Sequence, residues 1–279
     1  MSTSYLLSGD SSPTVRSAAV LSGGIKNLAT MTSLAAAFSA RSGVRFNPLG
    51  PCRDGQAVNE WVDLKTGDLA FEYTSTNSPS FSAASSGFPA VTFDGTNRRL
   101  TTRANTNKVS ITAGLTAYVV VNASNAGSIW ERYTGTALEN LRMSRSGLQV
   151  GGLFPAAGYT VNPSTIAILA ATWDQATKRQ INYLNGAIRI PASSSITGGT
   201  LISGGILQHS GTPVDAASSV RITIGARNDL AQDYSGSIYE IWLANAAHSD
   251  AERQAIEGQL AEFYGLRASL PADHPHYLA

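Results

Sequence analysis

The stretch of sequence that decides the fold runs from Thr165 to Ile190. It opens with Thr165-Ile-Ala-Ile-Leu-Ala-Ala-Thr-Trp173, an apolar run of the kind found in fully buried strands. Gln180-Ile-Asn-Tyr-Leu-Asn-Gly-Ala-Ile-Arg-Ile190 follows, with Asn185-Gly186 at its centre. Because Asn-Gly favours the two positive φ angles of a type I′ turn, these residues predict a β-hairpin.

Further short β-prone segments lie on both sides of this hairpin. The clearest cover residues 116–121, 128–133, 220–224 and 236–243, and turn-forming Gly, Asn and Ser residues separate them. Strands do not alternate with helices in a βαβ pattern, so a parallel sheet is not expected. The sequence therefore predicts an all-β sandwich.

One helix is predicted near the C-terminal end. Ser249-Asp-Ala-Glu252 has the spacing of a capping box, in which each terminal residue bonds the backbone amide of the other. Ile256, Leu260 and Phe263 or Tyr264 then recur at helical spacing, and Gly265 suits the position after a helix end. We expect a helix over residues 250–264, with its charged face in solvent.

Composition excludes several classes of protein. The 279 residues carry 20 Lys+Arg and 19 Asp+Glu, for a net charge of +1, so binding to nucleic acid through bulk charge is not expected. One cysteine, Cys52, rules out an internal disulfide framework. No stretch has the length of a membrane span, and the first residues lack the pattern of a secretory signal.

The first 33 residues differ from the rest in composition, since Ser, Thr, Gly and Ala dominate them. They predict either a flexible leader or an arm that becomes ordered against a partner. The next segment is ambiguous. Leu28, Met31, Leu34 and Phe38 have the spacing of a short helical stripe, whereas Leu34-Ala-Ala-Ala-Phe38 can equally form a first strand.

Three motifs together resemble the concanavalin A-like, laminin-G-type jelly-roll modules. They are Asn59-Glu-Trp-Val-Asp63, Gly87-Phe-Pro-Ala-Val-Thr-Phe-Asp-Gly-Thr-Asn97, and the C-terminal series from Tyr234 through the helix to Leu270-Pro-Ala-Asp-His-Pro-His276. The resemblance implies a jelly-roll sandwich over residues 34–268, a first strand at Leu34, and a tail over 269–279 that packs on the sandwich.

Such modules occur in tailed-phage virion proteins and in bacterial surface or secreted proteins. By this resemblance we expect a non-enzymatic virion structural protein, in which residues 1–33 attach to other virion proteins and the sandwich contacts host-surface glycans. A homo-oligomer or a larger assembly is expected, without membrane insertion. The alternative is a freestanding bacterial carbohydrate-binding protein, and a glycoside hydrolase is a third possibility.

No catalytic group is predicted. A retaining glycoside hydrolase needs two carboxylates about 5–5.5 Å apart, whereas Glu131, Glu139 and Glu240 each stand alone in the sequence. Cys52 lies beside Arg53 in a turn-like segment and is interpreted as an ordinary thiol. His274-Pro-His276 lacks a third convergent metal ligand and is interpreted as part of the packed tail.

Two sets of residues are candidates for ligand binding. Calcium prefers carboxylate and carbonyl oxygens, and the candidate ligands in the loops are Asp215, Asn228, Asp229 and Asp233. The alternative interpretation is that these residues form turns, in which Asp and Asn are common. Glycan recognition uses aromatic faces and planar polar groups, and its candidates are Tyr133, Tyr159, Tyr234, Arg98 and Arg227. The four tryptophans are assigned to the core.

Overall fold

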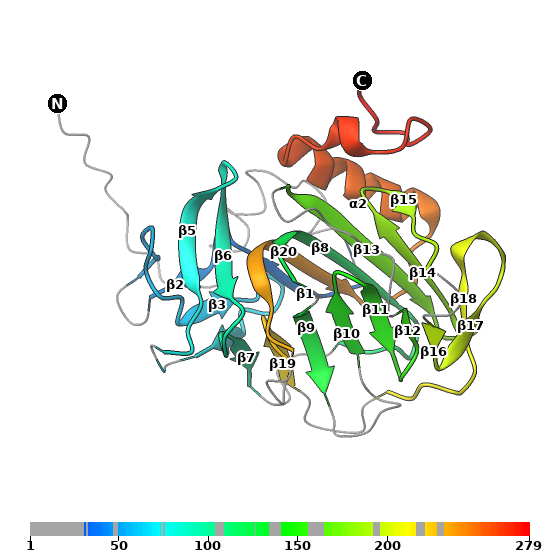
Figure 1. Cartoon of the computed structure of the whole chain (residues 1–279), viewed down its shortest axis with the longest axis horizontal. Helices are drawn as coiled ribbons and strands as arrows, with labels where there is room; N and C mark the ends of the chain where they lie inside the picture. Colours follow the sequence, from blue (N-terminus) through cyan, green and yellow to red (C-terminus); the bar gives the residue numbers. More distant parts are fainter. Residues whose placement is uncertain are drawn as a thin grey trace.

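The computed structural model shows two large antiparallel sheets packed face to face, with one α-helix against the outer side of the first (Figure 1). No helix among the residues that it describes is long and apolar enough to cross a membrane. The structure describes residues 31, 33–46, 50–72, 74, 76–103, 109–125, 127–133, 141–155, 165–191, 196–215, 221–227 and 232–279.

The first sheet has ten strands. Its main path runs through β17 (Gly199–Leu201), β18 (Leu207–His209), β14 (Arg179–Leu184), β13 (Ala167–Asp174), β8 (Leu115–Ala123), β20 (Ser235–Ala244), β6 (Phe88–Asp94) and β5 (Ser80–Ser85). Two further strands lie off this path: β1 (Leu34–Ser39) pairs with β20, and β15 (Ala187–Ile188) pairs with β14.

The second sheet has eight strands. Its order is β11 (Gly147–Val150), β10 (Leu141–Ser144), β9 (Ser128–Tyr133), β19 (Arg221–Ile224), β7 (Leu100–Thr102), β4 (Leu69–Phe71), β3 (Glu60–Val62) and β2 (Val44–Arg45). A separate pair joins β12 (Phe154–Pro155) to β16 (Ile196–Thr197). The helical elements are α2 (Asp250–Phe263) and two short 3-10 turns, η4 (Ser203–Gly205) and η5 (Arg267–Ser269).

The apolar side chains form two layers. The larger lies between the two sheets and includes three of the four tryptophans, Trp61, Trp130 and Trp173. The second layer lies between the first sheet and α2, where Trp242 and Tyr239 of β20 belong to the same cluster as Leu260 of the helix. All four tryptophans are at most 1% exposed, which confirms their predicted place in the core.

The predicted hairpin and capping box are confirmed, whereas the expected exposure of the charged face of the helix is wrong for Arg253 and Glu257, which are buried and paired with each other. Asn185 and Gly186 both have positive φ, 47° and 79°, and they connect β14 to β15 as a hairpin. The Asn185 side chain also accepts the amide of Ile168, which ties the turn to the neighbouring strand β13. Helix α2 begins after Ser249, and both hydrogen bonds of the capping box with Glu252 are present.

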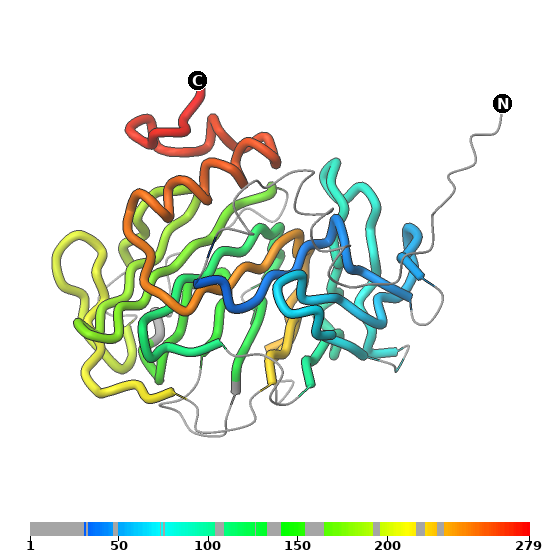
Figure 2. The backbone as a smooth tube through the Cα atoms, turned by 180° about the vertical axis from the view of Figure 1, so that it is seen from behind, coloured from blue at the N-terminus to red at the C-terminus, as the bar shows by residue number. Residues whose placement is uncertain are grey.

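The ambiguity at residue 34 is resolved in favour of a strand. β1 runs antiparallel to the second half of β20, with Ala37 opposite Trp242 and Phe38 opposite Ile241 (Figure 2). A helical stripe at this position is therefore wrong, because the edge of β20 supplies the backbone partners. Residues 1–30 and 32, which make up nearly all of the predicted arm, lie outside the described residues.

The tail after the helix lies against α2. Leu270 is 4% exposed and His274 is 5% exposed, and the His274 Nε2 atom is 3.5 Å from a carboxylate oxygen of Glu257. A Cβ atom added at Gly258 would come within 2.2 Å of the His276 ring. Because glycine has no Cβ atom, Gly258 leaves space on the helix for the His276 ring of the tail.

A buried carboxylate joins β1, β20 and α2. Glu240 is 1% exposed, and its Oε1 atom accepts hydrogen bonds from Ser39 Oγ, Arg41 Nε and the Tyr264 hydroxyl. Its Oε2 atom accepts the Trp242 indole N–H. Burial raises the pKa of Glu240, whereas the Arg41 guanidinium acts in the opposite direction.

Replacing Glu240 with Ala should destabilise the fold strongly. The change leaves the Arg41 guanidinium and several buried donors without their acceptor, so we expect the free energy of unfolding in urea to fall by about 3–5 kcal/mol. Glu262→Ala, on the exposed side of α2, is the matched control and should change it by less than about 0.5 kcal/mol. Equal stability of the two variants would contradict a supporting role for Glu240.

Candidate functional site

A single row of side chains crosses the outer face of the second sheet from one edge to the other. Directly paired residues of neighbouring strands point to the same face, so the cross-strand register places each member of the row. At about 4.8 Å per strand, the row is about 34 Å long. Its members, in order, are Gln149, Arg142, Glu131, Thr223, Thr101, Phe71, Glu60 and Arg45.

The residues that alternate with this row confirm which face it occupies. Trp130 and Met143 are paired with each other and belong to the core between the sheets, as do Leu100 and Trp61. Because successive residues of a strand point to opposite faces, the row faces away from that core. Seven of its eight members are polar or charged, so the outer face of this sheet is hydrophilic along its full width.

One part of the row is buried and charged. Glu131 and Arg142 are directly paired on adjacent strands and are 3% and 5% exposed. The Arg142 guanidinium also donates to the side-chain oxygen of Gln232, in the segment that leads into β20. Thr223, which is paired with Glu131, is likewise buried at 3% exposed, and we call Glu131, Arg142 and Thr223 the charged section.

The other part of the row contains its one aromatic ring, and its residues are half-buried or exposed except for Glu60, which is 8% exposed. Phe71 is half-buried, with Thr101 on one side and Glu60 on the other. The Arg103 guanidinium carbon lies 5.8 Å from the centroid of the Phe71 ring. We call Arg45, Glu60, Phe71, Thr101 and Arg103 the aromatic section. It combines an aromatic face with planar hydrogen-bonding groups.

The two carboxylates of the row are too far apart to cooperate in glycoside hydrolysis. Glu131 and Glu60 are separated by four strand spacings, or about 19 Å. Retaining and inverting mechanisms need carboxyl groups about 5–9.5 Å apart. Glu240 belongs to the other sheet and is held among side chains of β1, β20 and α2. Within the row, no two carboxylates have the spacing that either mechanism requires.

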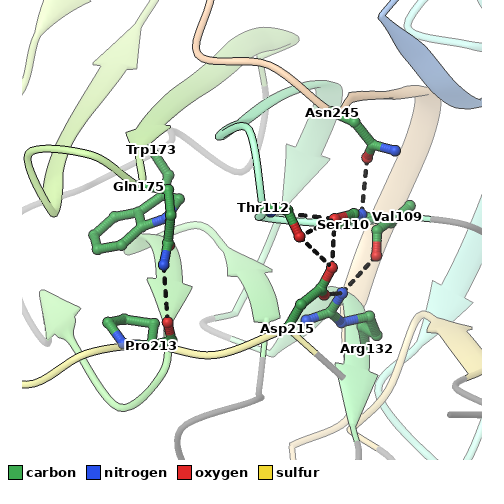
Figure 3. Close-up of polar contacts among 9 residues, drawn as sticks. All are labelled: Val109, Ser110, Thr112, Arg132, Trp173, Gln175, Pro213, Asp215 and Asn245. Carbon is green, nitrogen blue, oxygen red and sulfur yellow. Dashed lines mark hydrogen bonds and ion pairs between the residues drawn. The ribbon is translucent and has the colours of Figure 1, made fainter. Parts of the chain in front are cut away.

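A second polar cluster closes one end of the space between the sheets (Figure 3). Arg132, 2% exposed, donates to Asp215 over 2.6 Å and also to the carbonyl of Val109. The other oxygen of Asp215 accepts from the hydroxyls of Ser110 and Thr112. Through Asp215, this cluster holds the 210–215 segment in place across the ends of the neighbouring strands.

Nearby contacts hold the same segment. Gln175 donates to the carbonyl of Pro213 and accepts the indole N–H of Trp173 (Figure 3). The backbone amide of Ser110 donates to the side chain of Asn245, which follows β20. The cluster therefore links four separate parts of the chain. We interpret it as a structural feature that closes this end of the space between the sheets, and we call it the closure.

Of the four predicted calcium ligands, the structure describes Asp215 and Asp233, and each has another partner. Asp215 is neutralised by Arg132, so a guanidinium takes the place that a cation would need. Asp233 accepts the backbone amide of Asn97. Asn228 and Asp229 lie outside the described residues. Within the described part of the chain, no group of three or more His, Cys, Asp or Glu residues could hold a metal ion.

The predicted glycan-binding residues are scattered. Tyr234 is fully buried, and its hydroxyl donates to backbone carbonyls of Asn122 and Ser237, so its assignment to a surface site is wrong. Its burial follows from its edge contact with Phe93 in the core. Arg98 forms an ion pair with Asp94 in the bend after β6.

Of the remaining glycan candidates, Arg227 is the one whose side chain the structure describes. Arg227 follows β19 and is partly exposed. Tyr133 ends β9 opposite Arg221, and only its backbone is described. Tyr159 lies outside the described residues.

Sequence reasoning missed the aromatic section. Phe71 lies in Leu69–Phe71, a strand of three residues that is too short to show a period. Its neighbours in the row come from other strands, Glu60 from the preceding strand β3 and Thr101 from β7, and only the cross-strand register shows that they meet. Leu100-Thr-Thr-Arg103 also shows no period, because three polar residues follow one another after Leu100.

The comparisons with known proteins concern the fold. No protein-family model matches the chain, and no curated protein matches it. Domain 4 of an extracellular arabinanase from Geobacillus stearothermophilus is similar in structure, with a TM-score of 0.47 and 11% identity over 79% of this chain and 96% of that one. A sialidase from Trypanosoma rangeli has a TM-score of 0.45 and 14% identity over 83% of this chain.

This chain spans 33% of the length of that sialidase. A carbohydrate-binding module of a Ruminococcus gnavus sialidase, solved with sialyllactose, has a TM-score of 0.35 and 14% identity over 50% of this chain and 80% of that one. The all-β jelly-roll-type sandwich with a helix near its C-terminal end is confirmed.

The prediction of a phage virion structural protein is wrong. The similar solved structures named above are an arabinanase domain, a sialidase and a carbohydrate-binding module, and none of them is a virion protein. The motifs that suggested a virion protein are shared by sandwiches of many functions, so they specify the architecture and not the assembly.

Replacing Asp215 with Asn tests the structural role of the closure. The change leaves the Arg132 guanidinium, which is 2% exposed, without its counter-charge, so we expect the free energy of unfolding to fall by about 1–3 kcal/mol. Asp273→Asn, an exposed position in the tail, is the control. If Asp215 were instead a calcium ligand, adding calcium would raise the melting temperature of the wild type and not that of D215N.

The Cys52 thiol should react slowly with alkylating reagents. Burial raises the pKa of Cys52 to about 11, and its Sγ atom donates to the carbonyl of Ala57. Because the thiolate is the reactive form, labelling by iodoacetamide at pH 8 should be at least tenfold slower than labelling of free cysteine. The rate should rise steeply toward pH 11. Rapid labelling at pH 7 would contradict this protected environment.

Proposed function

We propose that this protein binds carbohydrate, without catalysing its hydrolysis, on the aromatic section of the second sheet. The observation that carries the proposal is the position of Phe71. It is the one aromatic residue in an otherwise polar row, and Arg103, Thr101 and Glu60 lie around its ring.

Sugar rings have a chemistry that suits such a surface. One face of a pyranose is lined by C–H groups and packs on an aromatic ring, while its rim carries hydroxyls that both donate and accept hydrogen bonds. Arg103 supplies donors, Glu60 supplies acceptors, and the hydroxyl of Thr101 can do either. The aromatic section therefore offers partners for both the face and the rim of a sugar.

The rigidity of the surface supports the same proposal. Phe71, Thr101 and Glu60 lie on paired strands whose inner residues are packed in the core, so their backbone positions are fixed before a ligand arrives. A preorganised surface loses less conformational freedom on binding than a set of loops does. Phe71 is half-buried, so the residue keeps contact with solvent beside the Arg103 guanidinium that lies over its ring.

Phe71→Ala should remove most of the carbohydrate affinity. A glycan array identifies a bound oligosaccharide, and calorimetry then compares the variant with the wild type. We expect affinity to fall roughly tenfold or more, equivalent to about 1.4 kcal/mol, because the stacking surface is lost. Phe81→Ala, a half-buried phenylalanine on β5 of the other sheet, is the matched control and should retain binding.

Both variants must unfold cooperatively for this comparison to hold, which circular dichroism checks. Wild-type affinity in F71A would contradict the proposed site. A broad array without any bound glycan would contradict the proposed function itself.

A further inference from the structure

We propose that the ligand is an acetamido sugar, in which an N-acetylated amine replaces one ring hydroxyl, and that Val62 and Leu69 bind its acetyl methyl group. This inference rests on the proposed function, because it names the class of carbohydrate bound at Phe71. The observation behind it is a pair of aliphatic side chains that lies next to the Phe71 ring on the outer face of the second sheet.

The register of β3 and β4 places this aliphatic pair on the face that Phe71 occupies. Val62 is directly opposite Leu69. Leu69 and Phe71 flank Ala70 on the same strand, and Ala70 is a fully buried member of the core between the sheets. Because successive residues of a strand point to opposite faces, Leu69 and Val62 point outward together with Phe71. We call Val62 and Leu69 the apolar corner.

The apolar corner is separate from the core. Among the described residues, neither apolar layer includes Val62 or Leu69, and both are half-buried. On the other side of Val62 lies Gly43, whose carbonyl accepts the Val62 amide. A Cβ atom at Gly43 would come within 3.0 Å of the Val62 Cβ atom, so the glycine leaves this flank of Val62 without a side chain from residue 43. Part of the aliphatic surface therefore stays in contact with solvent.

An aliphatic pair beside a ring that stacks on sugar favours a ligand with an apolar substituent. A hydroxyl placed against Val62 and Leu69 loses hydrogen bonds to water and gains no new partner from these two side chains. A methyl group placed there removes apolar surface of both the ligand and the protein from water. Burial of one such group is equivalent to about fourfold in affinity.

The polar groups around the Phe71 ring select the acetamido group among substituents that carry a methyl. An acetamido group also has a carbonyl oxygen that accepts and an N–H that donates. The exposed Arg103 guanidinium, whose carbon atom lies 5.8 Å from the Phe71 centroid, presents five N–H donors to such an oxygen. The hydroxyl of Thr101, opposite Phe71 on β7, can accept the N–H. A 6-deoxy sugar offers its methyl group alone.

The experiment measures the calorimetric affinity of the full chain for two pairs of oligosaccharides that differ in the substituent at C2 of the sugar ring. The first pair is chitotetraose, which carries acetamido groups, and cellotetraose, which carries hydroxyls. The second pair is a disaccharide that ends in N-acetylgalactosamine and the same disaccharide ending in galactose. A fucose-terminated oligosaccharide is the probe for a methyl group without an amide.

The variants change the apolar corner and leave the stacking ring in place. Leu69→Asn replaces an aliphatic side chain with a polar one of similar size, and Val62→Thr is a milder change that keeps the branched shape. Ile188→Asn is the matched control, because Ile188 is an exposed aliphatic residue on β15 of the other sheet. Phe71→Ala is measured in parallel. Thermal unfolding followed by circular dichroism checks that each variant is folded, and Val62→Thr keeps the test open if Leu69→Asn is not.

We expect the acetamido member of at least one pair to bind about tenfold more tightly than its hydroxyl counterpart. Leu69→Asn and Val62→Thr should each reduce this ratio about threefold or more and leave the affinity for the hydroxyl member unchanged, whereas Ile188→Asn has no effect. Phe71→Ala should weaken the binding of both members, because the ring contacts the sugar itself.

Three results would overturn the inference while the proposed function stands. The first is equal affinity for both members of each pair, with binding lost in F71A. The second is a wild-type ratio in folded Leu69→Asn and Val62→Thr variants. The third is tighter binding of the fucose-terminated probe than of either acetamido probe, which would assign the apolar corner to a methyl group alone. Absence of binding to every probe would also reject the inference, and the glycan array then decides the proposed function separately.

Discussion

The structure depends on the alternation of side chains along the strands of the second sheet. Trp130 and Ile224 must face the first sheet to complete the core, and this requirement forces Glu131 and Thr223 to face outward. A shift of one residue would exchange the two sets and place a carboxylate in the apolar layer. The continuous polar row is therefore a direct consequence of how the core is filled.

Three of the buried charged groups in the described part of the chain have partners of opposite charge that join separate segments or turns. Glu240 is surrounded by donors from β1, β20 and α2, and Arg132 lies against Asp215 at the strand ends. In the helix, Arg253 pairs with the fully buried Glu257 and stacks on the Tyr183 ring. Because removing one partner would leave a buried charge alone, these contacts fix where segments join. They also explain why Asp215 is a poor cation ligand.

The sequence predicted those features that are encoded locally. Asn185-Gly186, the capping box from Ser249 to Glu252 and the buried run ending at Trp173 each need only neighbouring residues. The candidate site could not be found in the same way. Thr101 and Thr223 are partners although more than a hundred residues separate them, and only the cross-strand register shows that they meet. Asp215 was predicted as a metal ligand because its partner Arg132 lies 83 residues away in the sequence.

The pairing of β1 with β20 has a consequence for how the chain folds. Leu34 is opposite Ala244, so one of the earliest strands receives its backbone partner only when one of the last has formed. Contacts that close such a long loop form slowly, and proteins dominated by such contacts fold at the slow end of the known range of rates. During synthesis, residues 34–39 leave the ribosome long before β20, the strand with which they pair, has been made. Until β20 forms, the hydrophobic segment Leu-Ala-Ala-Ala-Phe-Ser has no partner strand. In that state it can pair with another nascent chain, and a chaperone can bind it.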